Sequence, residues 1–349
     1  MTALHDLIAP SLEGGSRFGV HMLADMLCPQ EWALKYLARH PDGIGLTTRK
    51  GRALNVGSGW HQVLEAWYRT RVTDSSGAWC PDHGVPDLDA TVSHLTKWMN
   101  DHQSDWEDPD EWLKDYRTLT DGITKYHNFY GPGGPAAEYP ETQVYVDGTG
   151  PWIEREITVA LDHEFQFTSR IDLIVTYRGR LAVMEHKSTS ASFYHSLIDS
   201  LEIDAQPTAE LFTLMGATGL PYVPSTFFGN IWNKNPKRDG TGTPPFGRPI
   251  ISRTEEHVAH FTEMALDSLI EMNHRCERYL TLLKGGMDQF SAINACFPRR
   301  GLIFKHCVRF NRKCPFWALC QSGIGLNERN VMAFQPRIPR EGTDATATL

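Results

Sequence analysis

The sequence predicts an α/β protein with a mixed β-sheet core flanked by helices, a helical N-terminal half and a cysteine-rich C-terminal segment. Three observations support this class. Apolar residues recur at helical spacing before about residue 140, and strand-like apolar runs follow. The 349 residues, 41% of them hydrophobic, are enough to bury a large core. Three of the seven cysteines, Cys307, Cys314 and Cys320, cluster near the C-terminus.

The first half of the chain contains four predicted helices, the first of which carries Cys28. The pattern is strongest in GSGWHQVLEAWYRTR, where Trp60, Leu64, Trp67 and Tyr68 lie on one helical face. The glycines and prolines of GPGGP end the fourth helix. The four ranges are residues 22–37, 57–71, 89–102 and 110–130.

The second half alternates as strands do. Strands are expected over residues 143–146, 153–161, 164–176 and 180–187. A helix, two strands and a long helix capped by Thr254 follow over residues 206–218, 225–232, 249–252 and 254–283.

The expected organisation is a leader, one domain and a disordered tail. Within the domain we expect a helical part, a sheet core and a segment with the long helix and the cysteines. The leader, domain and tail are residues 1–21, 22–335 and 336–349, and the three parts of the domain are residues 22–140, 141–253 and 254–335.

Composition limits the setting of the protein. No apolar run is long enough for a membrane span, and the N-terminus lacks the features of a signal peptide. An odd number of cysteines argues against a full disulfide framework and for a reducing compartment. We therefore expect a cytoplasmic protein, in a bacterial or phage-infected cell, without a membrane partner.

Positive charge is concentrated in two segments although the net charge is −8. Local basic surface is typical of proteins that bind polyanions. The alternative is a solvated face balanced by acids elsewhere in the fold. The candidate nucleic-acid-binding residues of the two segments are Lys234, Lys237, Arg238, Arg309 and Arg312.

The stretch IDLIVTYRGRLAVMEHK is the most informative part of the chain. Alternation places Glu185 and Lys187 on one side of a strand, with His186 pointing away, and Asp172 opens the preceding strand. Buried charges need partners or a metal. Asp172 and Glu185 suit Mg²⁺ or Mn²⁺, with the backbone carbonyl of His186 as a third ligand, and Lys187 can orient water or stabilise developing charge. A structural ion pair at a strand end is the alternative.

Asp172 with Glu185-x-Lys187 resembles the core of the PD-(D/E)XK nucleases, in particular their RecB-like and Cas4-like branch. The resemblance implies a restriction-endonuclease-like fold. It also implies a metal ligand on an early helix, for which His61 in Gly57-Ser-Gly59-Trp-His61 is the match.

Two other parts of the family pattern are matched less fully. The family carries Q-x3-Y on the helix after the lysine strand; Gln206 fits, but Glu210 stands at the tyrosine position. Glu154 and Glu156 resemble the acid-bearing strand that precedes the family aspartate, where either could support the metal ligands or face solvent.

The C-terminal cysteines need a fourth partner if they bind metal. Cys296 is local and would complete a zinc site, whereas Cys28 is distant. Spacing alone does not separate zinc from iron–sulfur, since both accept four thiolates. The family resemblance implies a [4Fe-4S] cluster held by Cys28, Cys307, Cys314 and Cys320.

These features together predict a metal-dependent DNA nuclease, an exonuclease or DNA-end-processing enzyme acting on single-stranded DNA or on duplex ends. Repair, recombination, phage replication and CRISPR adaptation are the settings considered. Phe310, Phe316 and Trp317 could stack bases or pack around the cluster. No Walker A motif is present, so a helicase, recombinase or other replication protein would be a separate partner. The alternatives are a catalytically silent nucleic-acid-binding or assembly subunit and a zinc-stapled hydrolase of another substrate.

Overall fold

The computed structural model describes residues 3–8, 18–47, 51–73, 84–137, 142–219, 227–236, 243–300, 307–309, 312–321 and 327–337. The chain divides into two compact units. Unit 1 comprises Met1–Arg49, Thr158–Ser169 and Ala259–Leu349, and unit 2 comprises Lys50–Ile157 and Arg170–Val258.

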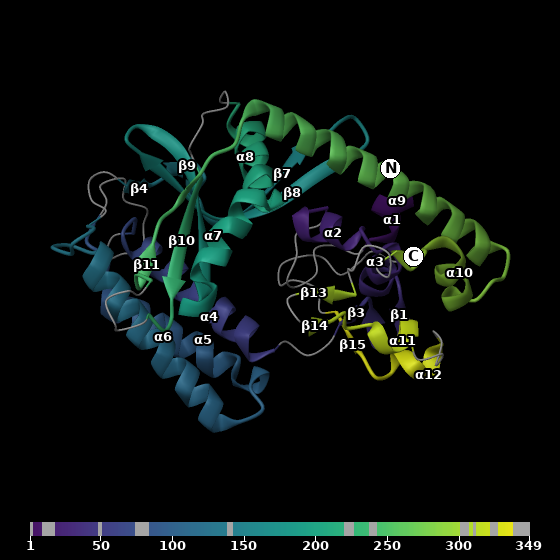
Figure 1. The fold of residues 1–349 in the computed structure, drawn as a ribbon, viewed down its shortest axis with the longest axis horizontal. Helices are drawn as coiled ribbons and strands as arrows, with labels where there is room; N and C mark the ends of the chain where they lie inside the picture. The colour runs from purple at the N-terminus through teal and green to yellow at the C-terminus, as the bar shows by residue number, and fades with distance from the viewer. Residues whose placement is uncertain are drawn as a thin grey trace. The chain divides into compact units, whose positions relative to one another are not determined.

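A seven-stranded mixed sheet forms the centre of unit 2, as predicted for an α/β protein. Its order is β11–β10–β9–β8–β4, with β12 beside β10 and β7 beside β8 (Figure 1). Strands β9 and β10 are parallel, whereas β9 pairs antiparallel with β8. The strands are β4 (Thr142–Val144), β7 (Ile153–Ala160), β8 (Gln166–Tyr177), β9 (Arg180–Thr189), β10 (Phe227–Asn233), β11 (Phe246–Gly247) and β12 (Ile250–Ile251), and a small ribbon pairs β5 (Val146–Asp147) with β6 (Gly150–Pro151).

Three helices, α4 (Arg52–Thr70), α5 (Leu88–Asp101) and α6 (Pro109–Tyr130), build the hydrophobic core of unit 2 with the sheet. Trp60 and Trp67 of α4 are almost fully buried there with Leu173 and Met184 of the sheet. Asp87 and Asp108 cap α5 and α6 by accepting hydrogen bonds from backbone N–H groups.

The crossover from β9 to its parallel neighbour β10 carries α7 (Tyr194–Ile203) and α8 (Ala205–Thr218). A parallel pair needs such a crossover, since its strands cannot be joined by a tight turn. Leu201 of α7 lies so close to Gly229 that a Cβ there would be 2.9 Å from it. Because Gly229 pairs with Glu185, α7 and α8 cover the sheet face on which Glu185 projects.

Unit 1 has a separate core in which Trp32, Phe297 and Phe316 are buried. Leu4 and Leu7, from the predicted leader, belong to that core. Its helices are α1 (Ala3–Leu7), α2 (Val20–Asp25), α3 (Pro29–Tyr36), α10 (Gln289–Cys296), α11 (Trp317–Gln321), α12 (Glu328–Val331) and most of α9 (Glu255–Lys284). Its ribbons are β1 (Arg39–His40) with β2 (Gly43–Ile44), β3 (Leu46–Thr47) with β15 (Gln335–Pro336), and β13 (Val308–Arg309) with β14 (Arg312–Lys313). Short 3-10 turns, η1 (Gln103–Asp105) and η2 (Ala191–Phe193), lie in unit 2.

The prediction of one continuous helix over residues 22–37 is wrong. The helix breaks at Cys28, whose backbone is extended with φ −118° and ψ 91°. The cause is Pro29, because a proline ring disfavours helical geometry in the residue before it and then starts the next helix well. Cys28 therefore lies at the N-terminus of α3.

The other predicted helices and strands match the structure to within a few residues at most ends. Residues 225 and 226 of the predicted strand lie outside the described residues, as does the predicted tail apart from Pro336 and Arg337. In the described part of the chain, no helix is both long and apolar enough to cross a membrane.

Candidate active site

Asp172 and Glu185 lie on neighbouring antiparallel strands and are buried together. The pairing of Leu173 with Met184 brings Asp172 of β8 beside β9, where Asp172 Oδ2 accepts a 2.7 Å hydrogen bond from the backbone N–H of His186. Only 6% of Asp172 and 2% of Glu185 is exposed. Burial, reinforced by the charge of Glu185, raises the pKa of Asp172 to about 7.

Glu185 keeps its charge because a lysine neutralises it. Lys187 Nζ lies 2.5 Å from Glu185 Oε1 and 3.1 Å from Gln206 Oε1. Burial would raise the pKa of Glu185, but the charges of Lys187 and His61 outweigh it and hold that pKa at about 2. Burial disfavours the ammonium of Lys187 as well, yet Glu185 and Asp172 raise its pKa above the ordinary value. The pair is a carboxylate and an ammonium.

Helix α8 contributes an amide that holds this pair. Gln206 Nε2 donates to Glu185 Oε1 at 2.7 Å and to Glu210 Oε1 at 2.8 Å, while Gln206 Oε1 accepts from Lys187. Asp204 caps α8 and fixes its start. Lys187, Glu185 and Glu210 together fix which way the amide of Gln206 points.

Glu210 is itself a buried acid, with 3% exposure. Burial, with the charges of Glu185 and Asp172, raises its pKa well above the ordinary value, which favours the neutral acid. Among the described residues, Glu210 Oε2 and Glu185 Oε2 are buried without a hydrogen-bond partner. An unpartnered carboxylate oxygen on Glu185 is free to ligate a cation.

His61, Glu154 and Asp172 bring ligand atoms within 4.8 Å of one another and could hold a metal ion. His61 Nδ1 of α4 lies 3.2 Å from Asp172 Oδ1 and 3.2 Å from Glu154 Oε1. Burial lowers the pKa of His61, but Asp172 and Glu154 reverse this effect and raise it well above the ordinary value. The raised pKa favours a protonated, positively charged imidazole at this position. A bound metal ion would bring its own positive charge, and the ring would have to lose its proton to ligate that ion.

The position of Glu154 follows from an unusual backbone. Its φ is +50°, in the left-handed region that glutamate rarely adopts. Its side chain is 6% exposed, and Oε2 accepts a 2.8 Å hydrogen bond from Arg170 Nε. Glu156, the other acid of this strand, is exposed. The sequence offered both acids as candidates, and no signal in it separated them.

The His186 side chain points away from these acids, as alternation predicted. Its ring stacks on Tyr68 at 5.7 Å, and Nδ1 lies 3.0 Å from Asn230 Nδ2. Burial lowers the pKa of His186 well below its ordinary value, so the ring is neutral. Arg248 donates to Asn230, Tyr68 and Tyr126, and this buried polar network supports the strand beneath the site.

The sequence model of the PD-(D/E)XK nuclease superfamily matches residues 26–321. The chain belongs to the PD-(D/E)XK nuclease superfamily. Members of this superfamily typically use divalent metals and act on DNA, which agrees with a site built from Asp172, Glu185 and Lys187.

More distant comparisons add little. No curated protein matches the sequence. The crystal structure titled "Putative exonuclease" from Eubacterium rectale has 11% sequence identity and a TM-score of 0.40, over 88% of this chain and 93% of that one. That likeness is too remote to refine what the superfamily match establishes.

The cysteines of this PD-(D/E)XK protein divide into two groups within unit 1. Cys314 donates its backbone N–H to the carbonyl of Cys307, and Cys320 Sγ lies 3.4 Å from Gln30 Oε1, two residues after Cys28. Burial and then the thiol of Cys28 raise the pKa of Cys307. Burial raises the pKa of Cys314 to about 12 and that of Cys320 to about 11, and Cys28 adds to both shifts.

Cys296 is buried in the core of unit 1 with Cys276, whose pKa is raised by burial and by Cys296. Half-buried Cys314 packs against the same core. Cys28 raises the pKa of each of the three C-terminal cysteines, so its thiol lies near them.

The predicted nucleic-acid-binding residues are described only in part. Lys234 is half-buried, while Lys237 and Arg238 lie outside the described residues, as do Phe310 and the side chains of Arg309 and Arg312. Phe316 is 1% exposed and packs on Phe334, so it is a core residue. Trp317 is half-buried, with the ammonium of Lys313 5.4 Å from its ring.

Proposed function

We propose that this nuclease is a metal-dependent DNA exonuclease or DNA-end-processing enzyme of the RecB-like and Cas4-like branch. The observation that carries the proposal is one buried group in which Asp172, Glu185 and Lys187 meet His61 and Glu154. Structural ion pairs do not need three carboxylates beside one another, because their mutual repulsion is costly unless a cation joins them.

The donor chemistry fits Mg²⁺ or Mn²⁺. Asp172, Glu185 and Glu154 offer carboxylate oxygens, His61 offers a ring nitrogen, and Glu185 Oε2 has no hydrogen-bond partner among the described residues. The backbone carbonyl of His186 is a further proposed ligand. When bound, the ion supplies Lewis acidity and lowers the pKa of a bound water.

The protein residues then have separate tasks. Lys187, held by Glu185 and Gln206, points a permanent ammonium at the reaction centre, where it can orient the attacking water and stabilise negative charge on phosphorus oxygens. Gln206 keeps Lys187 and Glu185 in register through its two hydrogen bonds. Buried Glu210 accepts from the amide of Gln206 and stands where the family has tyrosine.

We further propose a [4Fe-4S] cluster on Cys28, Cys307, Cys314 and Cys320. Four thiolates around zinc, with bonds of about 2.3 Å, would lie about 3.8 Å apart. The four thiols alone would also suit zinc, and it is the family resemblance that favours a cluster over a single zinc ion. Residues 22–335 would then form one nuclease domain whose unit 1 carries the cluster.

The remaining assignments follow from the same proposal. We expect a cytoplasmic enzyme that binds DNA through Lys234, Lys237, Arg238, Arg309 and Arg312. A helicase, recombinase or other replication protein would be a separate chain.

The decisive experiment compares wild type with Lys187→Ala on end-labelled single- and double-stranded DNA, in Mg²⁺, Mn²⁺ or EDTA. Lys187→Ala should lower cleavage by at least about a thousandfold while DNA binding persists. Lys97→Ala, on the exposed surface of α5, is the matched control. Cleavage unaffected by Lys187→Ala would refute the site, and DNA binding without cleavage by folded, cluster-loaded wild type would support the silent binding subunit.

A further inference from the structure

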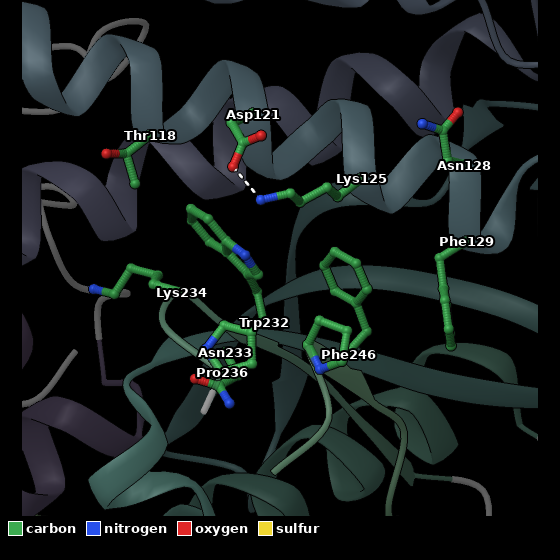
Figure 2. Close-up of a pocket in the computed structure, with 11 residues that line it drawn as sticks. Thr118, Asp121, Lys125, Asn128, Phe129, Trp232, Asn233, Lys234, Pro236 and Phe246 are labelled. Carbon is green, nitrogen blue, oxygen red and sulfur yellow. Dashed lines mark hydrogen bonds and ion pairs between the residues drawn. The ribbon is translucent and has the colours of Figure 1, made fainter. Parts of the chain in front are cut away.

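Unit 2 contains a pocket of about 410 Å³ (Figure 2), and none of its lining residues belongs to the carboxylate site. One wall is α6, from which Lys125 and Phe129 project. The end of β10 supplies Lys234 to the other wall, and β10 and β11 supply Trp232 and Phe246 to the floor. The volume lies in the range of pockets that bind small molecules.

The floor of this pocket is aromatic and rigid. Trp232 and Phe246 are each 4% exposed, and half-buried Phe129 lies 5.6 Å from Phe246. Trp232 is fixed from behind, since its ring stacks on Trp60 with centroids 4.1 Å apart. The buried rings of Trp232 and Phe246 therefore hold the floor in place, and half-buried Phe129 has the surface that a planar ligand can contact at little entropic cost.

Two lysines approach the pocket from opposite walls. Lys125 pairs with Asp121 one helical turn away. Lys234 is half-buried, and in the described part of the chain its ammonium makes no hydrogen bond or ion pair. Asp115 acts on this ammonium from a distance, but no carboxylate contacts it directly, so a phosphate could bind it.

The pocket adjoins the active site along the strands. Ile231 pairs with Lys187, Trp232 pairs with Ser188, and the backbone N–H of Lys234 donates to the carbonyl of Thr189. Lys234 therefore lies three residues, or about 10 Å, beyond Lys187 along the strands. Trp232 follows Ile231 in the strand, so it projects on the opposite face of the sheet from Lys187. A nucleic acid that reached both side chains would pass around the end of β9 and β10.

We propose that this pocket binds one nucleotide of an unpaired stretch of the nucleic acid substrate, with its base against Phe129 at the aromatic floor and its phosphate on Lys234. The proposal rests on the nuclease function proposed above. A purely apolar ligand would not need Lys234, and a bare phosphate would not need the aromatic floor. Bases inside a duplex hide their faces by stacking, so the occupant is single-stranded. A free mononucleotide shares this chemistry.

The test measures binding of fluorescein-labelled oligothymidylate by anisotropy, in Ca²⁺ so that binding is read without cleavage. The variants are Lys234→Ala, Phe129→Leu and the control Lys97→Ala, each checked for an unchanged melting temperature. Lys234→Ala should weaken binding about fivefold to tenfold and reduce the slope of log K against log salt by about 0.7. Phe129→Leu keeps apolar volume but removes the ring, and should weaken binding at least about fivefold.

An abasic strand of equal length separates the two contacts. On that probe Lys234→Ala should still weaken binding, whereas Phe129→Leu should have no effect. Binding by both variants within twofold of Lys97→Ala would overturn the pocket. Thymidine monophosphate competing as well as the oligonucleotide would overturn the strand assignment in favour of a free-nucleotide site. DNA binding without cleavage by the wild-type protein would refute the nuclease proposal but leave these binding differences intact, so the two failures are distinguishable.

Discussion

Replacing Asp172 with asparagine should destroy cleavage and stabilise the metal-free fold. The fold raises the pKa of Asp172 from 3.8 to about 7. At neutral pH the unfolded chain holds this group ionised while the folded chain disfavours that charge, so the folded state loses stability as pH rises. About three pKa units correspond to about 4 kcal/mol.

Asparagine avoids this cost because it is neutral, and its Oδ1 can still accept the hydrogen bond from the N–H of His186. The lost attraction to His61 is already part of this cost, because His61 is one of the groups that set the pKa of Asp172. The gain is therefore about 4 kcal/mol, or about 5 °C in melting temperature for a chain of 349 residues. Near pH 5 the gain should shrink to about 1.5 kcal/mol, because there most of the native Asp172 is protonated.

The assay is thermal unfolding in EDTA near pH 5 and about pH 7.5, with exposed Asp199→Asn of α7 as the control. Adding Mg²⁺ should then raise the melting temperature of wild type and leave Asp172→Asn unchanged, since only the native carboxylate supports ion binding. A variant that melts below wild type at about pH 7.5 in EDTA, or a gain independent of pH, would refute the assignment of repulsion to this carboxyl group.

Three further predictions address the surroundings of the site. Glu210→Leu should lower kcat about tenfold, because the amide of Gln206 loses one hydrogen-bond partner. Glu210→Gln keeps an acceptor and should stay near the kcat of wild type. An equal loss in both variants would contradict the positioning role of Glu210. Cys28→Ser should remove the brown colour and bound iron, and Cys296→Ser should keep both; the reverse result would replace the ligand set. Gly122→Ala places a Cβ 2.5 Å from the ring of Trp232. The variant should lower the free energy of unfolding, measured by denaturant titration, by about 1–3 kcal/mol. An unchanged free energy of unfolding would show that the ring can move.

Much of this architecture could be predicted from short-range patterns. The hairpin with Asp172, Glu185 and Lys187 follows from alternation, because a strand period of two fixes which side chains share a face. Helix α4 follows in the same way from the spacing of its aromatic residues. These features depend on neighbours in sequence, so one chain suffices to see them.

Other features depend on contacts that periodicity does not encode. Glu154 reaches His61 because one residue leaves strand geometry, and alternation treats it and Glu156 alike. Glu210 interrupts the family pattern, and only the structure shows that it occupies a buried position beside Gln206. The pocket at Trp232 joins α6 to β10 across about a hundred residues, which no local pattern reports.

The left-handed backbone at Glu154 bears on how this protein would respond to laboratory selection. Glycine adopts that conformation freely, whereas a residue with a side chain loses about 1 kcal/mol there. A screen for thermal tolerance alone should therefore enrich Glu154→Gly, and a screen for cleavage should discard it. The first screen would select glycine at position 154, which relieves the backbone strain. The second screen would keep glutamate there, because the strained backbone holds the Glu154 side chain in place at the site.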